Sequence, residues 1–413
     1  MAATEPPTPA APAAAGAPDE EPPRSPPPRP PQPPPRPASL ASALPFWFYL
    51  TAAVSVVALL LPHLLPSSTS PTLPLLLRLH VSDGSVLKLH PGPDLFAITS
   101  RPAAAASHRP ILFLPGLAAG SFSFRRVLHS LSSRGILAAA VDLPGQGQSP
   151  APAAPPRTNP FREIQNRGIF HAFEHLVQTG EVPFQEPAPE PSNTLYNAAE
   201  AAASVARAVH ALGIAPVHLV LHDSALVAGA AFVSANQAAV QSVTLIDGTA
   251  ILPAFPAAVL GVPVLGRMVV GVPALFKGLL HVCCARGMGS YEAEAHRAVM
   301  REEGKRDAVF ESWKALNQSF DLKEWRGSSE MVRNLPMMVL WSGSWSDRWI
   351  DEGKKVAAAL PDAKFAYHSG GRWPQEDAWD EISKLIAEFV TSLPTPLQSQ
   401  HIGQSSEQAA AQE

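Results

Sequence analysis

Asp223 is the residue whose type and surroundings most directly suggest chemistry. The segment His218-Leu-Val-Leu-His-Asp-Ser-Ala225 places it at the end of a short apolar run and before small residues. A carboxylate or hydroxyl on a sharp turn between a strand and a helix is a common nucleophile in covalent catalysis. Such a nucleophile needs a histidine as general base and an acidic residue that orients the histidine. Both partners must come from the ends of other strands.

The acidic partner has candidates, but the base does not. Asp247 and Asp347 each follow a predicted strand and could stand in the acid's place. The predicted closing loop reads Gly371-Arg-Trp-Pro-Gln-Glu376, and Arg372 occupies the position of the base. A guanidinium stays protonated near neutral pH and cannot accept a proton. His368 lies four residues earlier on the predicted strand, which leaves it about 10 Å short of the loop position.

Alternating strands and helices are expected to position these residues. The predicted strands are residues 111–114, 137–141, 217–221, 242–246, 337–341 and 364–367, and the predicted helices are 123–135, 194–212, 351–360 and 378–393. Residues 77–90 and 94–101 are expected to form an opening antiparallel pair, and about 249–334 a mostly helical insertion. This alternation predicts an α/β protein with a mostly parallel sheet and helices on both faces.

Four motifs in this order resemble the α/β-hydrolase fold. They are Pro115-Gly116, the segment from Asp142 to Ser149, the segment from His218 to Ala225, and the loop from Gly371 to Glu376. In that fold they would supply an oxyanion N–H, the turn after the fourth strand, the nucleophile turn and the histidine loop. The resemblance implies an α/β-hydrolase-like domain at residues 77–395, with its cap at about 249–334.

Within this resemblance the nucleophile turn is degenerate. The glycine positions around it, 221, 225 and 226, hold Leu, Ala and Leu. We interpret Asp223, Asp347 and Arg372 as degenerate triad positions with no catalytic residue among them, and expect Arg372 to pair with Asp223 or Asp347. The alternative is an epoxide-hydrolase-like enzyme with Asp223 as nucleophile, since the epoxide-hydrolase and dehalogenase branches read His-Asp-x-Gly-Gly. No cofactor and no metal is predicted.

The N-terminal residues differ in composition from the rest. Residues 1–43 are rich in Pro and Ala and are expected to be a disordered arm. Residues 44–65, from Leu44 to Leu65, contain no charged residue apart from His63 and predict a transmembrane anchor in the lipid bilayer. A linker at 66–76 follows, and residues 396–413 are expected to be a disordered tail. The net charge of −4, without a basic run, excludes nucleic acid as a partner.

Four smaller patterns bear on membrane topology, disulfide bonding, metal binding and the cap. Arg24, Arg29 and Arg36 precede the anchor and favour a cytosolic N-terminus with a lumenal domain, where Asn317-Gln-Ser319 would be a usable glycosylation sequon. Cys283 and Cys284 are adjacent, which predicts no disulfide. His171-Ala-Phe-Glu-His175 matches a zinc-peptidase spelling, but the predicted fold is wrong for that class. Residues 255–280 are very apolar and are predicted as cap helices.

Several segments together are similar to the AUXIN RESPONSE 4 family of plant proteins. They are Pro45-Phe-Trp-Phe-Tyr49, the segments 215–226 and 242–247, and the segment from His368 to Glu376. The resemblance covers about residues 44–395. It implies a non-catalytic accessory protein of the endoplasmic reticulum membrane. It also implies a partner, a polytopic auxin influx carrier, whose trafficking and polar localisation the protein assists, with effects on auxin response and root gravitropism.

Overall fold

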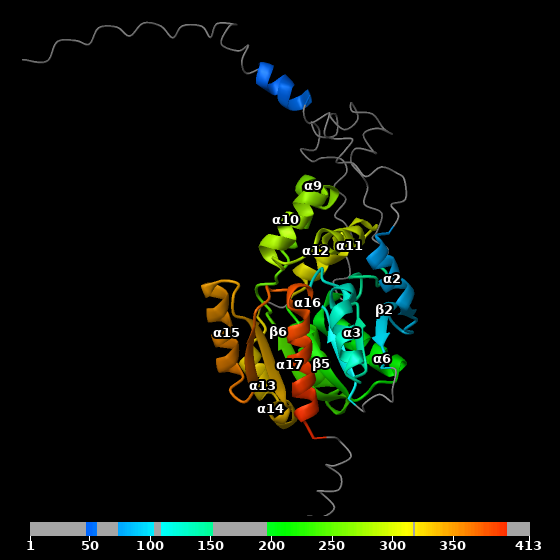
Figure 1. The fold of residues 1–413 in the computed structure, drawn as a ribbon, viewed down its shortest axis with the longest axis vertical. Coiled ribbons are helices and arrows are strands. Elements are labelled where there is room, and N and C mark those ends of the chain that lie inside the picture. Colours follow the sequence, from blue (N-terminus) through cyan, green and yellow to red (C-terminus); the bar gives the residue numbers. More distant parts are fainter. Residues whose placement is uncertain (1–46, 56–72, 103–108, 152–195, 317–318, 395–413) are drawn as a thin grey trace, which may run out of the picture. The chain divides into compact units, whose positions relative to one another are not determined.

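The computed structural model describes residues 47–55, 73–102, 109–151, 196–316 and 319–394 (Figure 1). The chain divides into two compact units, Met1–Leu59 and Leu60–Glu413. In the first unit residues 47–55 form a helix whose side chains are exposed. The remainder of the predicted anchor, the arm, the tail, the histidine pair 171/175 and Asn317 lie outside the described residues. Of the helices in the described ranges, none is by itself both long and apolar enough to cross a bilayer.

The second unit is built on an eight-stranded sheet. The strands are β1 (Gly84–Leu87), β2 (Leu95–Ser100), β3 (Ile111–Leu114), β4 (Ala138–Val141), β5 (Val217–His222), β6 (Val240–Ile246), β7 (Met337–Ser342) and β8 (Lys364–His368). Their order across the sheet is β1-β2-β4-β3-β5-β6-β7-β8. β1 and β2 pair antiparallel to their neighbours, and all other pairs are parallel. The predicted mostly parallel sheet is confirmed.

The pleat of the central strands divides the core into two layers. In β3, Leu112 and Leu114 pack on one face, whereas Ile111 and Phe113 pack on the other. Successive side chains of a strand point to opposite faces, so a strand buried on both sides reads as a continuous apolar run. The first face is covered by α6 (Ala198–Leu212), α7 (Ala225–Ala235) and α15 (Asp347–Ala359), and the second by α3 (Arg125–Ser133) and α17 (Trp379–Ser392).

The insertion after β6 is helical, as predicted. Its helices are α8 (Ala258–Gly261), α9 (Pro263–Gly271), α10 (Pro273–Cys283), α11 (Ser290–Arg301), α12 (Lys305–Lys314), α13 (Leu322–Gly327) and α14 (Glu330–Asn334). Helices α8 to α12 lie together at one end of the domain (Figure 1). They enclose an apolar cluster of their own, which includes Phe255, Phe276 and Trp373.

Two sequence predictions were wrong in this unit. The first was a strand at residues 77–90, where the chain instead forms α2 (Leu75–Asp83) and only then the short β1. Leu77 and His80, three residues apart, are the two buried residues of α2, so a helical stripe is buried in place of alternate residues. The second was the absence of a disulfide, because Cys283 and Cys284 are joined to each other at the end of α10.

Candidate functional site

Asp223 lies on a tight turn that is intact although its glycines are absent. The turn joins β5 to α7, and Asp223 has a φ of 52°, in the left-handed region. Aspartate tolerates that region better than most residues. Leu221 fills the first glycine position, and the space for it comes from Gly229 in α7, where an added Cβ would lie 2.2 Å from Leu221 Cδ2. A glycine on the opposing helix thus compensates for the glycine missing from the turn.

The carboxylate of Asp223 is buried and held by two neighbours. Its Oδ1 accepts a hydrogen bond from the backbone N–H of Ala254 at 2.9 Å, and Arg372 Nη2 lies 3.3 Å from the same oxygen. Oδ2 is buried and has no partner among the described residues. Burial raises the pKa of Asp223, and the charge of Arg372 opposes that rise. The expected contact between Arg372 and Asp223 is therefore present.

Arg372 is fixed from three sides. Besides Asp223 it donates to the backbone oxygen of Leu252, and its guanidinium carbon lies 3.8 Å from the ring centroid of Trp349. Burial lowers the pKa of Arg372, while Asp223 and Asp247 raise it. The side chain is only 11% exposed, so the cation is held largely out of water beside Asp223. Arg372 closes the site in the described structure.

His222, next to Asp223, has a structural role. Its Nδ1 accepts from the N–H of Gly116 at 3.1 Å, so the proton of the ring must be on Nε2. Nε2 in turn lies 3.0 Å from the backbone oxygen of Arg372 and donates to it. Burial lowers the pKa of His222, in agreement with a neutral ring. His222 therefore ties the loop after β3 to the closing loop and is not available as a base.

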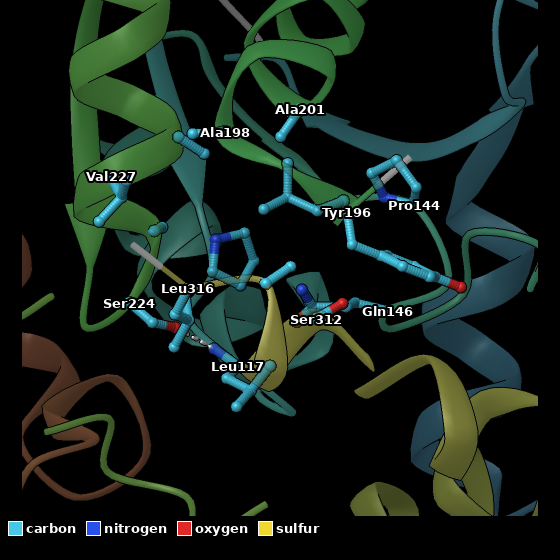
Figure 2. Close-up of a pocket in the computed structure, with 15 residues that line it drawn as sticks. Leu117, Pro144, Gln146, Tyr196, Ala198, Ala201, Ser224, Val227, Ser312 and Leu316 are labelled. Atoms are coloured by element: carbon cyan, nitrogen blue, oxygen red, sulfur yellow. Dashed lines mark hydrogen bonds between the residues drawn. The ribbon is translucent and has the colours of Figure 1, made fainter. Parts of the chain in front are cut away.

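Two backbone amides of the loop after β3, where one oxyanion donor is expected, are already used. The N–H of Leu117 donates to Ser224 Oγ at 2.9 Å, and the N–H of Gly116 donates to His222. An oxyanion hole requires donors that are free to bond the charge that develops in the transition state. The hydroxyl of Ser224 instead occupies one such donor (Figure 2).

The acidic positions are separated by the fold. Asp247 has a φ of 46°, is fully buried, and accepts from Ser342 N–H, Trp349 Nε1 and His368 Nε2 at 3.0, 2.7 and 2.8 Å. Asp347 is exposed at the start of α15 and belongs to no such cluster. Of the two acid candidates only Asp247 lies in the buried site, and its histidine partner is His368.

A second buried ion cluster was missed by the sequence reasoning. Glu376 accepts two hydrogen bonds from Arg125, at 2.7 and 2.9 Å, and a third contact from His296 at 2.8 Å. Burial would raise the pKa of Glu376, but Arg125 and His296 outweigh it and the net shift is downward. The cluster links α3, the cap helix α11 and the short helix α16 (Pro374–Asp377). The one sequence signal for this cluster is that Glu376 is the last residue of the motif that contains Arg372.

A small pocket lies beside the turn, on the side of Ser224. It encloses about 50 Å³ and is lined without charged residues by parts of the β3 and β4 loops, α6, α7 and the end of α12 (Figure 2). Gln146 and Tyr196 supply polar atoms, and Gln146 Oε1 is buried without a partner among the described residues. Burial, together with Glu311 and Asp307, raises the pKa of Tyr196 to about 12. Asp223 is not among the lining residues.

No cluster of three or more potential ligand side chains that could hold a metal ion occurs among the described residues. The zinc-peptidase spelling lies outside them. Within the described site the acidic groups are engaged by Arg, Trp, His or backbone donors. The charged and polar groups around Asp223 thus bond mainly one another.

Comparison with known proteins agrees with this architecture. Residues 109–359, more than half of the chain, match the family described as "alpha/beta hydrolase fold". Among solved structures, a putative lipase from Acinetobacter baumannii is 14% identical, with a TM-score of 0.55, and the match covers 79% of this chain and 98% of that one. Cfl2 from Burkholderia cenocepacia (16%, TM-score 0.54, 74% and 95%) and the enol-lactonase from Burkholderia xenovorans (14%, TM-score 0.51, 74% and 100%) are also similar. At these identities the likeness shows the fold alone.

Proposed function

The chain belongs to the alpha/beta hydrolase fold family, and we propose that it is a member of that family without hydrolase activity. One observation carries the proposal. Arg372 stands at the position of the general base and contacts Asp223, the residue at the nucleophile position, at 3.3 Å. A protonated guanidinium cannot take a proton from water or from a nucleophile.

The chemistry of an aspartate nucleophile explains why this contact matters. An ester formed on Asp223 would have to be cleaved by a water molecule activated by a base, and neither His222 nor His368 is placed for that step. His222 uses both ring nitrogens in structural bonds. His368 is oriented by Asp247 through Nε2 and its buried Nδ1 has no partner among the described residues, but no hydrogen bond joins His368 to Asp223 there. Loss of the histidine from a catalytic triad costs about 10⁶-fold in rate.

A hydrolase remains the second candidate function, and two observations favour it. Asp223 has the positive φ of a nucleophile turn. The similar solved structures include proteins named as a lipase and a lactonase. This candidate is an epoxide-hydrolase-like enzyme in which Asp223 attacks the substrate.

An activity assay separates the two candidates. The full chain, in detergent or in vesicles, is expected to hydrolyse neither nitrophenyl esters nor epoxides above the rate of the buffer. The matched control is Asp223→Asn, which removes the nucleophile and keeps the shape of the side chain. Turnover by the natural chain that is lost in Asp223→Asn would replace the proposal with the hydrolase.

The sequence resemblance supports a finer proposal for the cellular role. A non-catalytic domain behind an apolar segment at 44–65 fits an accessory protein of the endoplasmic reticulum membrane that assists trafficking and polar localisation of an auxin influx carrier. Crosslinking in intact endoplasmic reticulum membranes, followed by identification of partners, is expected to recover the carrier. Recovery of the carrier from Asp223→Asn membranes at the same level is also expected, since the role requires no catalysis. Absence of the carrier from the crosslinked partners would refute this role.

The orientation of the domain has its own test. The arginines before the apolar segment favour a lumenal domain, so protease added to sealed microsomes is expected to spare residues 77–395. The same protease with detergent present serves as the control for accessibility. Digestion of the domain in sealed microsomes would reverse the proposed orientation.

A further inference from the structure

Helices α9 and α10 present an apolar surface that the domain leaves open. We define this cap surface by the exposed large side chains of residues 262–282, which are Val262, Leu265, Leu275 and Val282. Val282 is 79% exposed and Val262 49%. The two helices stand at one end of the domain, beyond α11 and α12 and away from the sheet (Figure 1). Several exposed apolar side chains on neighbouring helices can mark a contact site with a membrane or a protein.

The inner and outer faces of α10 show that this exposure is not a packing accident. Phe276 and Leu280, four residues apart, are buried in the core of the cap. Leu275 and Val282 lie on the opposite side and are exposed, two turns of helix apart. A helix that faces only its own domain and water would carry polar residues on that outer stripe. The outer stripe of α10 therefore suits an apolar environment.

The charges within the segment that carries the cap surface have one sign. From Gly248 to Tyr291 the sequence contains no Asp or Glu, but it contains Arg267, Lys277 and Arg286. In the part of the chain that the structure describes, Lys277 bonds the hydroxyl of Ser290, Arg286 bonds the backbone oxygen of Trp345, and no carboxylate pairs with any of the three cations. Apolar side chains among basic ones, without acids, are typical of helices that lie on anionic lipid.

The lengths of the helices decide how they would meet a bilayer. Leu265–Gly271 and Pro273–Cys283 together have the length and composition of a span, but they are bent by 99°. The longer of the two would cover about 16 Å at 1.5 Å per residue, against a hydrocarbon core of about 30 Å. Neither helix can cross alone. A bent pair of this kind can lie in the interface with its outer side chains among the acyl chains.

From these observations we propose that the cap surface of α9 and α10 inserts into the interfacial layer of a bilayer that contains anionic lipid. The contact is separate from the segment at 44–65 and from the closed site at Asp223. This contact would hold the cap end of the domain against the membrane surface. A second copy of the chain, or an apolar segment of another protein, is the competing occupant.

Photolabelling from within the lipid tests the proposal on the full chain. The protein is reconstituted into vesicles of phosphatidylcholine with about one third phosphatidylserine and a lipid-borne diazirine, and the labelled peptides are identified by mass spectrometry. Peptides from residues 262–282 are expected to be labelled several-fold above those containing Met331 and Tyr367. These two residues are 54% and 48% exposed on other elements and serve as the internal control. Insertion of residues 44–65 would tether the chain to the vesicle but would not by itself place residues 262–282 in the lipid. Labelling of peptides from 262–282 therefore reports the proposed contact.

Matched variants separate lipid from the competing occupants. Leu275→Glu with Val282→Glu is expected to abolish labelling of the cap surface, whereas Met331→Glu leaves it unchanged. These positions are exposed, so the melting temperature checks that folding is unaffected. Arg267→Gln or vesicles of pure phosphatidylcholine are expected to lower labelling, since each basic group near an anionic surface strengthens binding by about fivefold. Labelling of the cap surface that only equals that of the control peptides would overturn the proposal. The proposal would also be overturned if Leu275 were found crosslinked to a second copy of the chain and the cap surface were therefore shielded from the lipid label.

Discussion

Removal of Arg372 is the most informative perturbation of the buried site. Arg372→Ala takes away the contact of 3.3 Å with Asp223, the hydrogen bond to Leu252 and the packing on Trp349. Asp223 is fully buried, so its charge would remain with the N–H of Ala254 as its chief partner. Breaking a buried pair from one side costs about 3–5 kcal/mol, and we expect a loss of unfolding free energy in that range.

The second variant shows whether the loss comes from the pair. Asp223→Asn removes the charge that Arg372→Ala leaves uncompensated, so the double variant is expected to be more stable than the sum of the single losses predicts. We expect a coupling free energy of about 2 kcal/mol, within the range for residues in one ion pair. Urea unfolding of the full chain, with the denaturant slope compared between variants, measures it.

The pH dependence gives an independent check with a defined sign. Burial already raises the pKa of Asp223 from 3.8, and without Arg372 it should rise further. The folded variant then binds the proton more tightly than the unfolded chain, so its stability falls as pH rises from the unfolded value through the folded one. The deficit of Arg372→Ala should therefore be smaller near about pH 4 than near about pH 8. A coupling below about 0.5 kcal/mol, or a deficit independent of pH, would refute the paired site.

Three further changes test the surrounding structure by thermal or urea unfolding. Gly229→Ala is expected to cost about 1–3 kcal/mol, because its Cβ would lie 2.2 Å from Leu221 Cδ2, and adding Leu221→Ala should recover part of the loss. Glu376→Gln is expected to cost about 3 kcal/mol, because Arg125 loses the carboxylate that it bonds twice and keeps only Glu292, at 3.8 Å, as an ionic partner. Since the pKa of Glu376 is lowered in the fold, the natural chain should lose this stabilisation as pH falls below about 4.5, and the variant should not. Trp349→Phe removes a hydrogen bond to a buried carboxylate and should cost about 1–3 kcal/mol. Losses below about 0.5 kcal/mol would show that these contacts do not stabilise the fold.

The sequence determined the layout of the folded domain and the type of residue at the predicted position of the base. The apolar runs of β3, β5, β6 and β7 and the amphipathic pattern of helices such as α3, α6 and α17 are local signals, so they could be read residue by residue. The helix α7 is buried on nearly all sides and gave no such pattern. Arg372 could be recognised as unable to act as a base from its side chain alone. The sequence also indicated that Arg372 would contact a carboxylate. The first residues of the domain were read wrongly, because leucines at 75–79 suit a strand or a helix until their burial is known.

Only the tertiary structure decided which groups meet. It placed Asp247 with His368 and left Asp347 exposed, although both acids follow a strand in the sequence. It also showed Ser224 bonded to an amide of the β3 loop, and Glu376 bonded to Arg125 from a helix more than two hundred residues away in the chain. Hydrogen bonds of this kind depend on atomic positions that the whole sheet and cap set together. No local pattern of residues determines those positions. The sequence thus fixes the kinds of group that are available, and packing fixes which of them satisfy one another.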